Sequence, residues 1–218
     1  MQVHNLSESN SILNHFVSQL RNVDVQHDSM RFRRNIERIG EVLAYEISKT
    51  YEYSNSTVET PLGQKATMEL ASKPVICSIL RAGLPLHTGI LNYFDDADNG
   101  FVSAYRHHPK SDDDYFDILV EYQAVPDLRG RNLILADPML ATGQSLVAVF
   151  NKLMEKGAPK EIHIAIVIAA PEGIAHLEKH LPANCHLWTA AIDDRLNEKN
   201  YIVPGLGDAG DLAYGSKL

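Results

Sequence analysis

The sequence lacks long hydrophobic runs and has few cysteines. No stretch approaches 18 consecutive apolar residues, which argues against a membrane-spanning helix, and residues 1–10 lack the apolar centre of a secretory signal. The two cysteines, Cys77 and Cys185, are too few for a disulfide framework. We therefore expect a protein of a reducing compartment, the cytoplasm, with no membrane partner.

Positive charge is also scarce. Lysine and arginine together number 20 against 28 aspartates and glutamates, which leaves a formal charge of −8. Proteins that bind nucleic acids through the phosphate backbone need clustered cations, so we expect no nucleic-acid partner. Any phosphate-bearing ligand must instead be held by a local site.

The distribution of apolar residues predicts a single α/β domain over residues 1–218. No repeat, low-complexity tract or linker divides the chain, and residues 29–49 carry apolar side chains at helical spacing. Short apolar runs then alternate with helical patterns. The expected strands are VICSIL (75–80), NLILAD (132–137), IHIAIVIAA (162–170) and HLWTAAI (186–192), and the expected helices span 142–157 and 171–182.

This alternation predicts a parallel β-sheet flanked by helices, because right-handed crossovers join successive parallel strands. Ligands of such sheets bind at the carboxyl ends of the strands. The loops that follow Leu80, Asp137 and Ile192 are therefore where a functional site is expected.

The strongest local motif is DPMLATGQS, residues 137–145, between an expected strand and an expected helix. Backbone N–H groups at a helix start bind anions, hydroxyls of Thr142 and Ser145 can donate to phosphate oxygens, and Gly143 permits close approach. The pattern is not a Walker A loop, since G-x-x-x-x-G-K-[ST] is absent. The alternative is an ordinary helix with Thr142 as its N-cap.

DPMLATGQS resembles the 5-phosphoribosyl-1-pyrophosphate (PRPP) loop of the uracil phosphoribosyltransferase family, whose usual form is DPMLATGGS. ILRAGL (79–84), VIAAPEGI (167–174) and LNEKNYIVPGLGDAGD (196–211) resemble the same family in the same order. The likeness implies a type I phosphoribosyltransferase core. It also implies N-terminal helices at about 8–50, a β-hairpin arm at about 101–127 and a C-terminal base-binding hood at about 193–218.

The resemblance implies a set of PRPP-binding residues. They are Arg81, Arg106, Asp137, Pro138, Met139, Leu140, Ala141, Thr142, Gly143, Gln144, Ser145 and Asp208. Of these, Arg81, Asp137 and Asp208 would be catalytic. The forked guanidinium of Arg81 suits pyrophosphate, because it is always charged and matches phosphate oxygens.

Uracil would bind at Ile202, Gly207, Asp208 and Ala209, mostly through main-chain groups. The reaction implied is transfer of the phosphoribosyl group of PRPP to N1 of uracil, which gives UMP and pyrophosphate in pyrimidine salvage. Mg²⁺ would enter bound to PRPP, with no direct protein ligand. The resemblance also favours a homo-oligomer, a dimer or higher, and allows activation by GTP.

Two other functions remain open from the sequence. A phosphoribosyltransferase for another base should alter GLGDAGD, which is intact here, and a regulatory protein that binds PRPP and uracil without catalysis would tolerate changes at Arg81 or Asp208. Gln144 replaces a glycine of the usual loop. If its φ is positive, the side chain costs on the order of 1 kcal/mol.

Several other residues are expected to have no role in the site. His176 and His180 have the i, i+4 spacing of zinc ligands, but no HExxH motif or third ligand accompanies them. The segment His107-His108 to Asp112-Asp113-Asp114 is expected to be a solvated hairpin tip, and Cys77 a core residue.

Overall fold

The structure is a computed structural model that describes residues 1–107 and 117–216, with the side chains of 105–107 and 117–120 left out. Its centre is an 8-stranded sheet in the order β1-β10-β9-β7-β4-β5-β6, with β8 paired to β9. All pairs are parallel except β5 with β6. The strands are β1 (Gln2–Asn5), β4 (Val75–Leu80), β5 (Asp98–His107), β6 (Asp117–Ala124), β7 (Asn132–Ala136), β8 (Met139–Leu140), β9 (Glu161–Ala169) and β10 (Cys185–Ile192).

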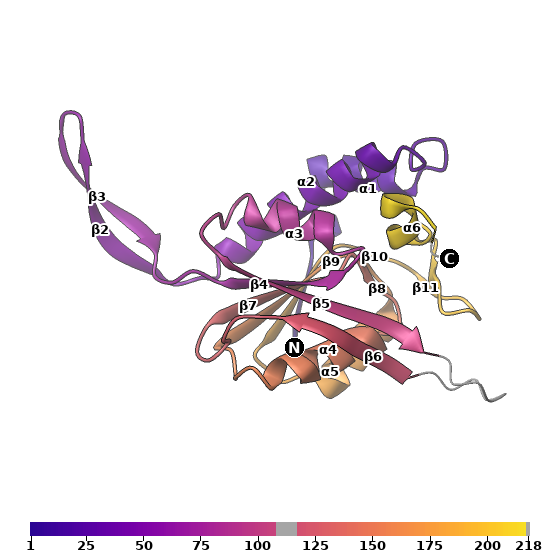
Figure 1. Cartoon of the computed structure of the whole chain (residues 1–218). Coiled ribbons are helices and arrows are strands. Elements are labelled where there is room, and N and C mark those ends of the chain that lie inside the picture. Colours follow the sequence, from indigo (N-terminus) through magenta and orange to yellow (C-terminus); the bar gives the residue numbers. More distant parts are fainter. Residues whose placement is uncertain (108–116, 217–218) are drawn as a thin grey trace.

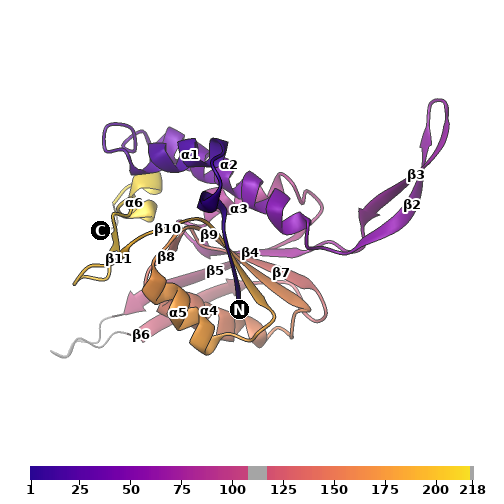
Figure 2. The same ribbon diagram turned by 180° about the vertical axis from the view of Figure 1, so that it is seen from behind.

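Helices cover both faces of this sheet (Figures 1 and 2). One face carries α1 (Ile12–Arg21), α2 (Ser29–Ser48) and α3 (Leu84–Leu91), and the other carries α4 (Gln144–Met154) and α5 (Pro171–His180). The short α6 (Ala209–Tyr214) packs beside α2 at the end of the chain. Over the described part of the chain, no helix is long and apolar enough to cross a membrane.

Strand β7 shows why the apolar runs form the centre of the sheet. Leu133 and Leu135 point to the core beneath α4 and α5, whereas Ile134 and Ala136 point to the core beneath α1, α2 and α3. Each of these four side chains is fully buried. A run without polar alternation suits a parallel strand because such a strand has no solvated face.

The helix boundaries follow from local chemistry. Ser11 caps α1 in a capping box with Asn14, and the Asp28 carboxylate accepts a hydrogen bond from the Arg31 N–H, 3.0 Å away, to cap α2. Helix α5 begins at Pro171, whose missing N–H costs nothing in the first turn. The amphipathic helix predicted over residues 29–49 is α2.

The parallel α/β sheet predicted from the sequence is confirmed, and β4 has the predicted bounds Val75–Leu80. Strand β1 was not predicted, although it adds an edge by pairing in parallel with β10. The segment expected as a hairpin arm instead contributes β5 and β6 to the main sheet, where they pair antiparallel. The tip at 108–116 lies outside the described residues.

A different hairpin projects from the body, built by β2 (Tyr53–Thr60) and β3 (Gly63–Leu70), which pair only with each other (Figure 1). Its side chains are mostly exposed, and Leu62 at the turn is 99% exposed. A lone two-stranded hairpin has marginal stability in water. This arm was not expected from the sequence, because the polar residues of β2 and β3 show no strand-like apolar alternation.

Candidate active site

A cleft of about 500 Å³ opens where the carboxyl ends of the central strands meet the C-terminal segment. Its walls come from the loops after β4 and β7, from β5 and from residues 199–210. The residues that line it are Ala82, Ala104, Asp137, Pro138, Met139, Ala141, Ser145, Lys199, Tyr201, Gly207, Asp208, Ala209 and Gly210. The site therefore lies at the end of the sheet where parallel topology predicts it.

The loop from Asp137 to Ser145 is built into the sheet by backbone hydrogen bonds. The Pro138 carbonyl accepts from the N–H groups of Val167 and Ile168, each at 3.0 Å, and the Leu140 carbonyl accepts from the Ala170 N–H at 2.8 Å. Between these bonds, Met139–Leu140 forms β8 beside β9. The loop is thus a continuation of the sheet rather than a free connection.

The start of α4 has no side-chain cap. Gly143 occupies the N-cap position with φ of 78°. The Thr142 hydroxyl lies 3.5 Å from the Gln144 N–H, at the limit of a hydrogen bond. A separate hollow of about 80 Å³ lies against this end, lined by Asp137, Met139, Leu140, Ala141, Thr142, Gly143, Ser145 and Leu146. Exposed N–H groups, hydroxyls and the helix dipole suit a phosphate group there.

Two glycines let α5 approach this loop closely. A Cβ at Gly173 would lie 2.3 Å from the Ala141 carbonyl oxygen, and one at Gly143 would lie 3.1 Å from the Gly173 carbonyl oxygen. The positive φ of Gly143 adds a second reason for glycine at that position. The segment Pro171-Glu172-Gly173 at the start of α5 therefore packs against the back of this loop.

Asp137 lines both the cleft and the smaller hollow at the start of α4. Its carboxylate accepts a long hydrogen bond, 3.4 Å, from the Met139 N–H, and no cation contacts it among the described residues. Burial raises the pKa of this carboxyl to about 7, since desolvation disfavours the charged form. A strongly shifted acid in a cleft marks a functional site.

The C-terminal wall is formed by a tight chain reversal. Strands β11 (Arg195–Leu196) and β12 (Ile202–Val203) pair antiparallel, and Gly205 and Gly207 follow with φ of 65° and 92°. Asp208 then caps α6, its carboxylate accepting from the Asp211 N–H at 3.0 Å. Gly207, Asp208, Ala209 and Gly210 line the cleft.

Three predicted site residues lie differently from the others. Arg81 follows β4, but its guanidinium donates to the Gly215 carbonyl at 3.2 Å and lies 3.7 Å from the Asp211 carboxylate, outside the cleft lining. Ile202 is 5% exposed and packs in the core. Arg106 belongs to β5 opposite Ile118, and its side chain lies outside the described residues.

The premise of strain at Gln144 is wrong. Gln144 is the first residue of α4 and is exposed, and the positive φ belongs to Gly143 before it. The bulky side chain therefore fits without backbone cost. The alternative that Thr142 is the N-cap of α4 is also wrong, because Gly143 occupies that position.

Sequence reasoning missed Lys199 and Tyr201, both of which line the cleft. Within the parts of the chain that the structure describes, Lys199 is the only cation in that lining. Both residues lie inside LNEKNYIVPGLGDAGD, so the motif itself was the available signal.

His176, His180 and Cys77 are not among the residues that line the cleft, and the expected hairpin tip at 108–116 lies outside the described residues. His176 and His180 contact each other on α5, with ring centroids 4.1 Å apart, and no group of three potential metal ligands occurs among the described residues. Cys77 and Cys185 are free and buried, and burial raises the pKa of the Cys77 thiol to about 12.

Comparison with known proteins gives a consistent result. The sequence profile of the uracil phosphoribosyltransferase family matches residues 7–216. A uracil phosphoribosyltransferase of Porphyromonas gingivalis is 52% identical over 218 residues, which cover 100% of both chains. One of Thermococcus gammatolerans is 37% identical over 215 residues, 97% of this chain and 92% of the relative. The solved structure of the AQ2163 protein from Aquifex aeolicus, 29% identical, covers 100% of both chains with a TM-score of 0.87.

Proposed function

The chain belongs to the uracil phosphoribosyltransferase family, and on this premise we propose that its cleft joins uracil to PRPP, giving UMP and pyrophosphate. It is a glycosyltransferase of the pentosyltransferase type, with a place in pyrimidine salvage. The observation that carries the proposal is the single cleft whose walls are the loop from Asp137 to Ser145 and the segment from Gly207 to Gly210. The two walls offer groups suited to the two substrates.

The 5′-phosphate of PRPP is assigned to the hollow at the start of α4. Its uncapped N–H groups and the hydroxyls of Thr142 and Ser145 are the donors available to phosphate oxygens. In this binding mode the ribose would lie over Asp137, which would accept from the ribose hydroxyls once ionised. Binding of PRPP must then favour the ionised form of Asp137, because burial raises the pKa of this carboxyl to about 7.

The pyrophosphate is assigned to the side of the cleft nearest Ala82 and Asp208. Arg81 would reach it by leaving the Gly215 carbonyl and the Asp211 carboxylate, two contacts of an exposed side chain that water can replace. Lys199, which also lines the cleft, offers a second cation. Arg106 keeps the PRPP-binding role implied by the resemblance.

Uracil is assigned to the main chain from Ile202 to Ala209. Its N3–H is a donor between two carbonyl acceptors, so a backbone carbonyl flanked by N–H groups would complement it. The positive φ of Gly205 and Gly207 supports this role, since it lets successive peptide groups face one side.

In the reaction, uracil N1 attacks the anomeric carbon, the bond to pyrophosphate breaks and the N1 proton is lost, so no protein nucleophile is required. Glycosyl transfers of this kind have an oxocarbenium-like transition state. The protein would contribute alignment of the two substrates and charges placed around the departing pyrophosphate. Asp208 is placed to hold PRPP or assist loss of the N1 proton.

We assign Mg²⁺ as the divalent metal that arrives with PRPP, where it would neutralise pyrophosphate charge. Mg²⁺ commonly binds through substrate phosphates and one or two carboxylates. The carboxylates of Asp137 and Asp208, which line the cleft, would face the metal-bound PRPP without serving as direct ligands. No larger cage of protein ligands is needed for it.

The test is to incubate the protein with radiolabelled uracil, PRPP and Mg²⁺, beside cytosine, orotate and hypoxanthine as competing bases. We expect labelled UMP from uracil and no nucleotide from the other three. Tight binding of both substrates without UMP would instead favour a regulatory protein. Addition of GTP to the same assay tests activation.

We also propose a homo-oligomer in the cytoplasm. The support is the β2–β3 arm, which has no partner strand in the described chain and exposes Leu62 and Met68. Sedimentation analysis should give a mass above that of one chain for the protein, and a shift toward the monomer for Leu62→Glu. A monomeric wild-type protein would exclude the oligomer.

Buried, reduced cysteines suit the cytoplasm.

A further inference from the structure

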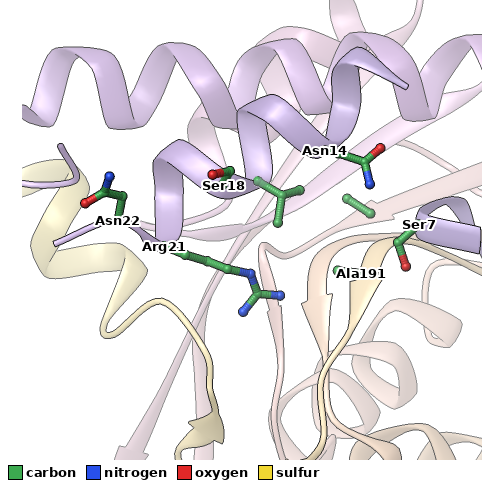
Figure 3. A pocket seen from close by; sticks show the side chains of 8 residues that line it. Ser7, Asn14, Ser18, Arg21, Asn22 and Ala191 are labelled. Carbon is green, nitrogen blue, oxygen red and sulfur yellow. The ribbon is translucent and has the colours of Figure 1, made fainter. Parts of the chain in front are cut away.

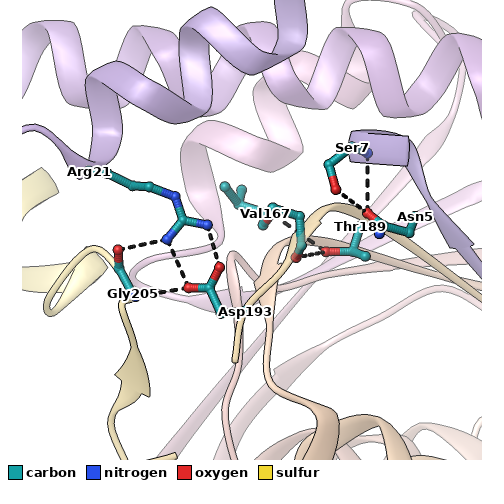
Figure 4. Close-up of polar contacts among 8 residues, drawn as sticks. Asn5, Ser7, Arg21, Val167, Thr189, Asp193 and Gly205 are labelled. Atoms are coloured by element: carbon teal, nitrogen blue, oxygen red, sulfur yellow. Dashed lines mark hydrogen bonds and ion pairs between the residues drawn. The ribbon is translucent and has the colours of Figure 1, made fainter. Parts of the chain in front are cut away.

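An ion pair outside the cleft holds the segment assigned to uracil. Figure 4 shows Arg21, at the end of α1, against Asp193, which directly follows β10. The two guanidinium nitrogens of Arg21 donate to separate carboxylate oxygens of Asp193, one at 2.8 Å and one at a shorter distance. This forked geometry restricts orientation as well as distance.

The same pair occupies both backbone polar groups of Gly205. The Gly205 N–H donates to the Asp193 carboxylate at 2.8 Å, and the Gly205 carbonyl accepts from Arg21 at 2.9 Å. Gly205 has a φ of 65°, and a Cβ there would lie 2.2 Å from the Ile202 carbonyl oxygen. The peptide groups on both sides of Gly205 are thus held by the side chains of Asp193, 12 residues away, and Arg21, 184 residues away.

Asp193 is in turn anchored in the sheet. Its side chain is 3% exposed, and its own N–H donates to the Ala169 carbonyl of β9 at 2.8 Å. A buried carboxylate needs a partner, because an unpaired buried charge is costly. Arg21 supplies that partner and carries the constraint onward to α1.

We propose that Arg21 and Asp193 are positioning residues for base recognition, acting through Gly205 on the main chain that reads uracil. This inference rests on the proposed function. A site that recognises a base through main-chain groups has no side-chain rotamer that can compensate for a misplaced contact. Its geometry therefore depends on the contacts that hold the peptide groups in position. Gly207 and Asp208, two and three residues after Gly205, line the cleft, whereas Arg21 and Asp193 do not.

Arg21 is accessible from a different hollow. A pocket of about 460 Å³ lies between α1 and the end of β10, and Figure 3 shows Arg21 in its wall beside Ser18 and Asn22. None of the residues lining this pocket also lines the substrate cleft. Gly205 is the residue at which the Arg21 guanidinium contacts the segment assigned to uracil, and a small cation could replace the guanidinium from the side of this pocket.

The test measures the KM for uracil and for PRPP separately in Asp193→Asn and Arg21→Lys. Loss of one charged hydrogen bond corresponds to about 10- to 100-fold in an equilibrium constant. We expect the uracil KM to rise by about tenfold or more, the PRPP KM to stay within about twofold, and discrimination against cytosine to fall. Guanidinium at millimolar concentration should restore uracil affinity in Arg21→Ala but not in Asp193→Asn.

The chain offers a matched control in Arg131 and Asp98. They are 2.6 Å apart, Arg131 also contacts the Pro74 carbonyl, and its side chain is 25% exposed, as is that of Arg21. This pair lies at the amino ends of β5 and β7, away from the cleft. Arg131→Lys and Asp98→Asn should leave both KM values unchanged.

Equal changes in both KM values, or a similar rise in uracil KM in the control variants, would overturn the proposal and leave a purely structural ion pair. Unchanged uracil KM in Asp193→Asn and Arg21→Lys would overturn it as well. These outcomes require a wild-type protein that makes UMP. A wild-type protein that makes none would instead refute the proposed function.

Discussion

The two walls of the cleft are built in different ways. The loop from Asp137 to Ser145 is made by consecutive residues and is bonded by its backbone into β9 next to it. The segment from Ile202 to Gly210 lies beyond the sheet and takes its shape from Arg21 and Asp193. The first wall is supported by the fold itself, and the second by side chains that come together only after folding. Base recognition should therefore be the more easily perturbed of the two functions.

The largest expected effect tests whether the base wall reads its ligand by main chain. Cytosine presents an amino donor at position 4 and an acceptor at N3, where uracil has the reverse. Two mismatched buried groups at about 1–3 kcal/mol each predict a discrimination of roughly 10²–10⁴-fold in kcat/KM. Similar values for the two bases would contradict main-chain recognition, and 5-fluorouracil, which keeps the pattern of uracil, should be accepted.

The phosphate wall should respond to loss of single hydroxyls. Thr142→Ala and Ser145→Ala remove donors to a charged phosphate and should each weaken PRPP binding by about 1–3 kcal/mol. Calorimetric titration with PRPP measures this directly. Thr50→Ala is the control, because that hydroxyl bonds to the Ile47 carbonyl away from the cleft. Wild-type affinity in both loop variants would remove the phosphate from this hollow.

Asp137 should lower the free energy of unfolding of the ligand-free protein at neutral pH. Its folded pKa of about 7 lies above the ordinary 3.8, so between pH 4 and 7 the unfolded chain releases a proton that the folded protein retains. The free energy of unfolding therefore falls through this range and stays reduced above it. Asp137→Asn should abolish that loss, so the free energy of unfolding should rise clearly at pH 8 and change little at pH 4.

Thermal unfolding of the ligand-free protein and of Asp137→Asn at the two pH values measures the difference. Each kcal/mol of added stability corresponds to roughly 2–4 °C in Tm for a chain of this size. The same variant should lose activity, because the amide cannot provide a carboxylate to the ribose. A pH-independent Tm difference would show that the carboxyl is ionised throughout.

The smallest effect concerns Gln144. As the exposed first residue of α4, it fits the helix, so Gln144→Gly should keep activity and lower stability by about 0.5–1 kcal/mol. This reverses the gain expected had its φ been positive. An inactive glycine variant with normal folding would instead indicate that the amide side chain contacts substrate. Denaturant unfolding and the uracil assay together decide between these outcomes.

The parallel sheet, the helices α2, α4 and α5 and the loop from Asp137 to Ser145 could be predicted from the sequence, because periodicity and a strand-loop-helix motif are properties of neighbouring residues. The sequence could not reveal the projecting β2–β3 arm or the edge strand β1, whose residues lack an apolar pattern of their own. Nor could it pair Arg21 with Asp193, 172 positions away, or orient Arg81 toward Gly215. These features depend on the folded chain, because burial and hydrogen bonds between distant residues are set by which elements pack together.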